Sequence, residues 1–226
     1  MHQMDAFAGK AFVLRVDEQT AHARETTLIA DLAFLSEHRV HPIVVAPNPH
    51  AARSLVRTIN RGGNAAVGLS GRDAGMLPRA SDGIGTVQTG ILQTLTAAGY
   101  VPVIEPTAFG VFSDDLEICA DDVAQAIASA TDAVRAVFFH ALGGVPDPQT
   151  AALIDERTPA EALALASDTR VAPDLRAAIR AAALGVRAGV GAAQICDGRV
   201  AHASIVELLT ARHLGTQVTG GIYLGA

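Results

Sequence analysis

Short apolar runs alternate with longer segments of helical periodicity along the chain, and this rhythm constrains the fold more than any other feature. Leu28, Leu32 and Leu35, for example, recur at the spacing of one helix face. Repeated strand–helix–strand units predict an α/β protein, a three-layer αβα sandwich around a mainly parallel sheet. We expect strands at 11–16, 41–47, 64–70, 100–106, 133–141, 190–198 and 215–224, helices at 23–38, 50–61, 85–99, 120–131, 158–167, 171–189 and 201–213, and a hairpin at 109–118 with its turn at 113–115.

Composition limits the kinds of partner. The chain has 226 residues, half of them hydrophobic, which suffices for one domain spanning 1–226 with a sizeable core. A net charge of −6 without a basic block argues against a nucleic-acid partner. No apolar run is long enough to span a membrane and the first residues lack a signal-peptide pattern, so we expect a cytoplasmic protein with no membrane partner. Cys119 and Cys196 are expected to be reduced thiols in the core.

Ligands of parallel sheets bind at the carboxyl ends of the strands. The candidate site segments are therefore 17–20, 46–50, 68–77, 105–121, 140–147 and 197–202. The segment GLSGRDAGML, 68–77, follows an apolar run and is rich in glycine. Its residues Gly68, Ser70, Gly71 and Arg72 are candidates for binding an anion, such as a phosphate, at a helix N-terminus. The alternative is a tight strand-to-helix connection that binds nothing.

Titratable residues near the same edge suggest other chemistry. Asp121 with Asp122 and Glu117 is a candidate metal site, although carboxylates that merely suit a helix N-terminus are the favoured interpretation. His140, at a strand end, is a candidate general base or ligand, and otherwise a structural histidine. Cys119 precedes a helix, where its pKa could be lowered, but a buried small residue is the simpler interpretation. The sequence leaves open whether Cys119, Asp121 and His140 form one cluster.

Four segments match the sequence motifs of one family in the same order, within a resemblance that spans nearly all of residues 8–219. They read INRGGNAAVGLSGRDAGML, GTVQTGILQTLTAAGYVPVIEPTAFG, LEICADDVAQAIASA and CDGRVAHASIVELLTARHLGTQV. On these segments the chain resembles the amino acid kinase family, and the acetylglutamate kinases in particular. The resemblance implies a three-layer αβα fold, homo-oligomers, and transfer of the ATP γ-phosphate to a carboxylate with magnesium, a step in amino acid biosynthesis.

The chain departs from this family where the family binds phosphate. The family's first strand ends in a Lys-x-Gly-Gly motif, but here Arg15, Asp17 and Glu18 occupy that place. The second strand should end in glycines whose amides cradle the γ-phosphate, but here it is followed by Pro47 and Pro49, which have no N–H to donate. The segment that follows in the family, which carries the acceptor-binding hairpin, is missing, so the single domain is expected to lack it.

Departures continue on the nucleotide side. The family's TDVPGV motif reads HALGGV, which places His140 beside the candidate nucleotide-binding residues Gly143 and Gly144. The family's second lysine falls at Asp174, or at Arg176 if the alignment slips by two. The only lysine of the chain, Lys10, precedes the first strand.

Three hypotheses follow for the function. The first is a pseudokinase that has lost phosphotransfer and has a regulatory, structural or ligand-binding role, with an anion, a nucleotide or a protein as partner. The second is an active, shortened kinase in which Arg15, Arg72 and the surviving acidic residue Asp121 use ATP and magnesium on a carboxylate of an amino acid derivative. The third is new chemistry by Asp121, His140 and Cys119. Because the neighbouring loops are altered, we favour the first, and the structural interpretation of 68–77.

Overall fold

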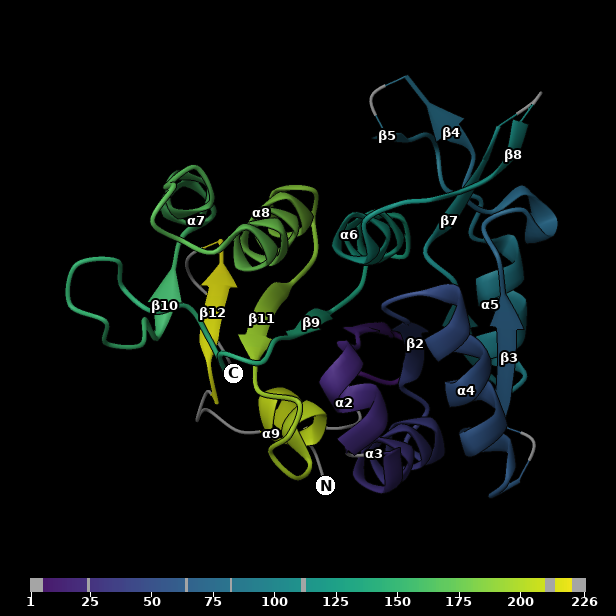
Figure 1. The fold of residues 1–226 in the computed structure, drawn as a ribbon. Coiled ribbons are helices and arrows are strands. Elements are labelled where there is room, and N and C mark those ends of the chain that lie inside the picture. Colours follow the sequence, from purple (N-terminus) through teal and green to yellow (C-terminus); the bar gives the residue numbers. More distant parts are fainter. Residues whose placement is uncertain are drawn as a thin grey trace.

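The computed structural model describes residues 6–23, 25–63, 65–81, 83–110, 113–209 and 214–220. An eight-stranded sheet runs through it in the order β10-β12-β11-β9-β1-β2-β6-β3 (Figure 1). The six strands from β11 to β3 are parallel, and β12 lies antiparallel to β11. The strands are β1 (Ala11–Arg15), β2 (His41–Val45), β3 (Ala66–Leu69), β6 (Val101–Ile104), β9 (Arg135–Phe139), β10 (Glu156–Arg157), β11 (Ala192–Cys196) and β12 (Thr216–Thr219).

Helices cover both faces of this sheet. One face packs against α3 (Glu25–Glu37), α4 (Pro49–Asn60) and α9 (Ala203–Leu209). The other face packs against α5 (Gly90–Ala97), α6 (Ala120–Ala130), α7 (Pro159–Ala166) and α8 (Pro173–Arg187). Figure 1 shows α6, α7 and α8 on one side and α3 and α9 on the other. The predicted three-layer α/β architecture is confirmed.

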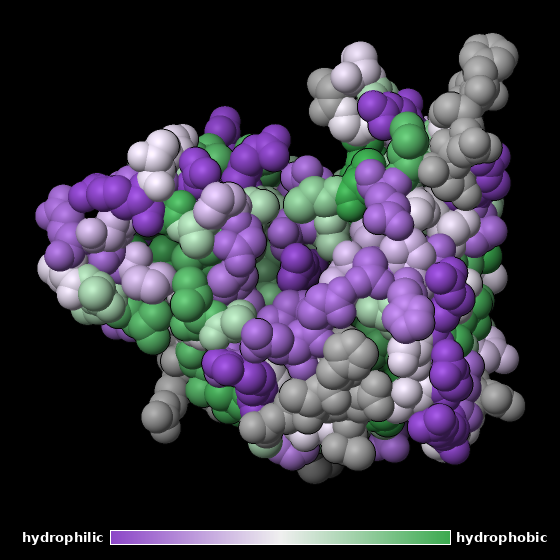
Figure 2. Space-filling model, in the orientation of Figure 1, coloured by the Kyte–Doolittle hydropathy of each residue, from purple (hydrophilic) through white to green (hydrophobic). Residues whose placement is uncertain are grey.

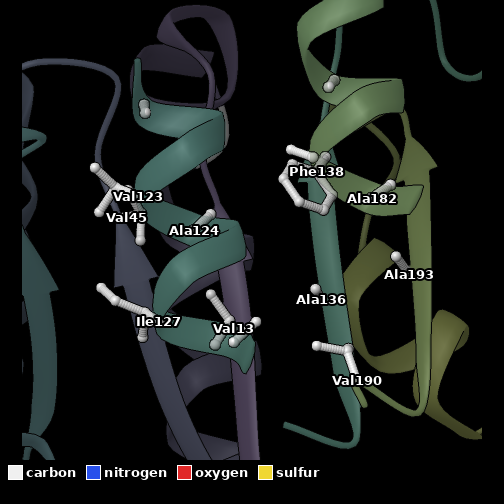
Figure 3. Close-up of a cluster of buried hydrophobic side chains, with 14 of the residues drawn as sticks. Val13, Val45, Val123, Ala124, Ile127, Ala136, Phe138, Ala182, Val190 and Ala193 are labelled. Carbon is white, nitrogen blue, oxygen red and sulfur yellow. The ribbon is translucent and has the colours of Figure 1, made fainter. Parts of the chain in front are cut away.

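The alternation of side chains along the central strands divides the core into two. Phe12 and Leu14 of β1 join the cluster beneath α3 and α4, whereas Val13 between them joins the cluster beneath α6 and α8. Ile127 of α6 lies beside Val13, and Ala182 of α8 faces the β9 and β11 side of the sheet (Figure 3). The small alanine side chains let α8 approach the strands closely.

Two hairpins extend beyond the sheet (Figure 1). One pairs β4 (Arg79–Ala80) with β5 (Gly83–Ile84), and the other pairs β7 (Thr107–Gly110) with β8 (Ser113–Glu117). The hairpin predicted at 109–118 exists, but its predicted turn at 113–115 is wrong. Because Gly110 is paired with Ser113, residues 113–115 belong to a strand, and the connection 111–112 lies outside the described residues.

Two helices differ from the prediction, one because it was not predicted and one because it starts later. Asp17 accepts a hydrogen bond from the Thr20 amide at 2.7 Å, so the predicted loop 17–20 instead starts the short helix α2 (Glu18–Ala23). The helix predicted at 85–99 starts only at Gly90, because the amides of Gly85 and Gln88 donate to the carbonyls of Pro78 and Met76. The predicted residues 210–213 and 221–224 lie outside the described residues. In the described part of the chain, no helix has the length and apolarity needed to cross a membrane.

Candidate functional site

An ion pair lies at the carboxyl end of β1, between the candidate catalytic residues Arg15 and Asp121. The guanidinium Nε is 2.8 Å from the Asp121 carboxylate, and the two side chains are only 19% and 5% exposed. Arg15 also donates to the Phe139 carbonyl at 3.4 Å. Burial raises the pKa of the Asp121 carboxyl above its usual value, although the Arg15 guanidinium opposes this shift. The charge of Arg15 is therefore directed at a buried carboxylate of its own chain.

A pocket of about 240 Å³ opens beside this pair, where β1, β2 and β9 end. The charged and conformationally restricted residues that line it are Arg15, Asp17, Glu18, Pro47, His140 and Asp174. Hydrophilic side chains gather across the middle of this face of the molecule, below α6 and α8 (Figure 2). Three carboxylates thus line the pocket, and its one guanidinium already has an anionic partner. The positions of the strand ends predicted Asp17, Glu18, Pro47 and His140 at this edge, and the structure brings them together with Arg15 and Asp174.

Asp17 and Glu18 also hold the local backbone. Asp17 caps α2 through the Thr20 amide, and the Glu18 carboxylate accepts from the Asn48 side-chain amide. Asn48 in turn caps α4, because its side-chain oxygen accepts from the Ala51 amide at 2.8 Å. The two loops that end β1 and β2 are therefore fastened together by carboxylate and amide contacts.

His140 follows β9 and is only 8% exposed. Its ring Nδ1 accepts a hydrogen bond from the Leu142 amide at 3.2 Å, so the proton of the neutral ring is on Nε2, which lies 3.2 Å from the Asp174 carboxylate. Partial burial alone would raise the pKa of the Asp174 carboxyl. The Leu175 amide and the nearby His140 outweigh burial and lower this pKa below its usual value. Both ring nitrogens thus have partners within the chain.

Cys119 does not join His140 in one cluster. Its sulfur lies 3.6 Å from the Asp121 carboxylate, but Cys119 lines a different pocket, of about 260 Å³, together with Asp122 and Arg180. The expectation that Cys119 is a core residue is wrong, because it is exposed, whereas Cys196 is buried as expected. Partial burial of the thiol and the charge of Asp121 raise the pKa of Cys119, which is opposite to an activated thiol.

In the described part of the chain, no three histidine, cysteine or carboxylate side chains lie close enough together to hold a metal ion. Asp122, considered with Asp121 as a metal ligand, instead lies 3.3 Å from the Arg180 guanidinium. The proposed oxygen-ligand site around α6 is therefore unsupported by the arrangement of these side chains.

The segment 68–77 uses its polar groups internally. The Ser70 amide and hydroxyl both donate to the Asp73 carboxylate, at 2.7 and 3.0 Å. The Gly71 amide donates to the Thr107 hydroxyl at 3.1 Å, and a Cβ at Gly71 would lie 2.0 Å from the Thr107 carbonyl oxygen. Glycine is required there by the close approach of β7, which favours the structural interpretation of this segment.

The structure also places the other candidate binding residues. Gly68 lies in edge strand β3, and the side chain of Arg72 is exposed. Gly143 and Gly144 have φ values of +72° and +152°, and the Gly143 amide donates to the His140 carbonyl at 2.9 Å. They form a tight turn after β9, and their role in nucleotide binding stays a prediction.

Arg199, which lies in the candidate segment 197–202, also belongs to the rim of this edge. Its guanidinium pairs with Asp197 at 2.8 Å and donates to the Ala141 carbonyl at 2.8 Å. This contact joins the loop after β11 to the loop after β9. Nothing in the spacing of an arginine near a strand end shows that it will bond to a loop so distant in sequence.

Comparisons with known proteins agree with the sequence motifs. No protein-family model matches the chain. The chain is 30% identical over 184 residues to the acetylglutamate kinase of Paracidovorax citrulli, covering 74% of this chain and 62% of the relative. It is 34% identical over 188 residues to the acetylglutamate kinase of Nostoc sp., covering 76% and 61%. The chain thus spans about three fifths of the length of the curated relatives it matches.

Solved structures agree on the fold. An N-acetylglutamate synthase from Neisseria gonorrhoeae, complexed with coenzyme A and N-acetyl-glutamate, superposes with a TM-score of 0.78 at 17% identity, covering 98% of this chain and 62% of that chain. A carbamate kinase from Giardia lamblia bound to AMP-PNP superposes with a TM-score of 0.66 at 11% identity, covering 95% and 99%. The chain is therefore a protein of the amino acid kinase fold, related in sequence to the acetylglutamate kinases.

Proposed function

We propose that this protein is a pseudokinase: an acetylglutamate-kinase-like protein that has lost phosphotransfer and keeps a regulatory, structural or small-ligand-binding role. The observation that carries this proposal is the acidic pocket at the ends of β1, β2 and β9, lined by Asp17, Glu18 and Asp174. A kinase must meet the charge of the transferring phosphoryl group with cations and amides placed in advance. In this chain, carboxylates line the pocket at these strand ends instead.

The electrostatic cost of placing a phosphate in this pocket supports the proposal. Two like charges about 4 Å apart repel by about 4 kcal/mol at an effective dielectric constant of 20. Arg15 does not offset this repulsion, because its guanidinium is paired with Asp121. Pro47, which lines the pocket, has no N–H to donate to a phosphate oxygen. Losing a single such donor typically costs a factor on the order of 10²–10³ in rate.

The proposal also covers the assembly and the location of the protein. We propose a homo-oligomer in the cytoplasm, because the family that the chain resembles often pairs subunits through helices and because this chain is alanine-rich and half hydrophobic. Light scattering at micromolar concentration tests the assembly, and a species of only 23.3 kDa would contradict it. A small anion, a nucleotide or a partner protein remains the candidate ligand, without turnover of ATP.

A coupled ADP-release assay tests the loss of activity. The protein is incubated with ATP, magnesium and N-acetylglutamate, and separately with a panel of other carboxylates, beside an active acetylglutamate kinase as the positive control. We expect no steady ADP release above the ATP-only background. Turnover of N-acetylglutamate that disappears in a folded Asp121→Asn variant would overturn the proposal. Turnover of another carboxylate alone would instead identify an active kinase with a different acceptor.

A further inference from the structure

His140 holds the loop that follows β9 through two of its own atoms. Its ring Nδ1 accepts from the Leu142 amide at 3.2 Å, and its backbone carbonyl accepts from the Gly143 amide at 2.9 Å. The first of these bonds exists only while Nδ1 carries no proton, because an N–H can donate only to a lone pair. One of the two bonds that hold this loop, the bond to the Leu142 amide, therefore depends on the protonation state of the ring.

Several charged groups surround the ring. Nε2 of His140 lies 3.2 Å from the Asp174 carboxylate at the start of α8. The ring also interacts electrostatically with Asp121 of α6, whose negative charge is shared with Arg15 of β1. The remaining charged groups at this rim are Asp17 and Glu18 in the same pocket, together with Arg199 and Asp197, which reach the next carbonyl of the loop. Carboxylates outnumber guanidinium groups around the ring.

We propose that His140 is a proton-sensitive switch that releases the Leu142 amide when its ring becomes charged. The neutral ring accepts the Leu142 amide and holds the turn, whereas the imidazolium carries a proton on each nitrogen and offers no acceptor. The released amide turns to solvent, and the charged ring keeps its contact with Asp174. This inference does not depend on the proposed loss of phosphotransfer.

The switch acts on the pocket described above. Ala141 lines that pocket, and its carbonyl is the acceptor that Arg199 uses to join the neighbouring loop. Leu142 is 52% exposed, so only part of its side chain packs against the protein. Since histidine changes its charge between pH 5 and 8, the rim of the pocket differs between the two ends of this range.

The amide of Leu142 reports the switch directly. With selective ¹⁵N-leucine labelling, the Leu142 signal is followed from pH 8 to pH 5 together with the ring protons of His140. We expect the two to titrate with one midpoint, and the protection of the Leu142 amide from exchange to fall about fivefold as a hydrogen bond of ordinary strength is lost. A Leu142 signal that stays constant while the His140 ring titrates would overturn the proposal.

Two variants separate the switch from a general effect of pH. In His140→Asn the side-chain oxygen accepts from the amide two residues on, as in an Asx turn, and does not titrate. The Leu142 signal should then be independent of pH, and continued titration contradicts the inference. Asp174→Asn, at a side chain that is 74% exposed, keeps an acceptor for Nε2 but removes the charge. It should move the midpoint to lower pH, and an unchanged midpoint also counts against the switch.

Discussion

Asp121 and Asp122 are neighbours in the first turn of α6, yet they meet opposite surroundings. Asp121 is 5% exposed and pairs with Arg15, while Asp122 is 45% exposed and pairs with Arg180 on the surface. Both lie in the first turn of the helix, near its positive end, so a comparison of the two mainly reports the effect of burial. Desolvation makes a buried charge depend on its partner far more than an exposed charge does.

Asp121→Ala is therefore expected to lower the free energy of unfolding by about 3 kcal/mol, because the partly buried Arg15 guanidinium loses its partner. Asp122→Ala is the matched control and should cost less than about 1 kcal/mol. Urea unfolding followed by circular dichroism measures both. Equal losses for the two variants would show that the buried pair has no special role.

The pH dependence of stability gives a second test of Asp121. Burial raises its pKa above the ordinary value of 3.8, so the folded state binds this proton more tightly than the unfolded chain does. The contribution of Asp121 to stability is then greatest below about pH 4 and falls as the pH rises through the folded pKa. The free energy of unfolding of the wild type minus that of Asp121→Asn should decrease between pH 3 and 6. An increase over this range would mean that Arg15 lowers the pKa instead.

At the scale of elements, apolar periodicity located most helices and strands within a few residues, because their buried faces recur at regular spacing. It failed for α2, whose residues Glu18–Ala23 read EQTAHA and show no apolar stripe. That helix depends on the cap from Asp17 to the Thr20 amide, a contact between neighbours that periodicity does not register. Likewise, Gly85 was predicted to be helical, but its amide donates to the Pro78 carbonyl and it precedes the helix.

The site was predictable only in part for the same reason. The strand ends placed Arg15, Asp121 and His140 at one edge of the sheet. The partners of these residues depend on side-chain directions: His140 contacts Asp174 of α8, and Cys119 lines a separate pocket. Spacing along the chain contains no information about which carboxylate a distant ring will meet.

The closeness of α8 to the sheet predicts an effect of enlarging one alanine. Ala182 is fully buried and faces the β9 and β11 side of the sheet (Figure 3). Ala182→Leu should cost about 1–3 kcal/mol, because the extra atoms have no space without moving the helix. The control Ala160→Leu adds the same atoms at an exposed position of α7 and should change stability by less than about 0.5 kcal/mol. Thermal or urea unfolding of both variants measures the difference, and two similar values would contradict close packing of α8.

At the scale of the whole molecule, the parallel sheet brings loops that are far apart in sequence to a single edge. The acidic residues after β1 and at the start of α8 meet the loop after β9 there, at the same pocket. Their charges act together on any ligand. The negative charge of the pocket therefore results from several loops that the fold brings together, and from no single motif. Removing the negative charge without disturbing the backbone contacts should therefore change which ligands the pocket accepts.

The double variant Asp17→Asn, Glu18→Gln makes this change. Asparagine keeps an oxygen for the Thr20 amide and glutamine keeps one for the Asn48 side chain, so the local structure is retained while two negative charges are lost. Inorganic tripolyphosphate should not raise the melting temperature of the wild type, because Asp17 and Glu18 repel it. It should raise that of the variant, since a ligand at ten times its Kd stabilises by about 1.4 kcal/mol, or a few degrees for a chain of this size. The control Asp155→Asn, Glu156→Gln removes the same charge at the β10 edge and should behave like the wild type. Equal stabilisation of the wild type and the Asp17→Asn, Glu18→Gln variant would show that these carboxylates do not exclude phosphate.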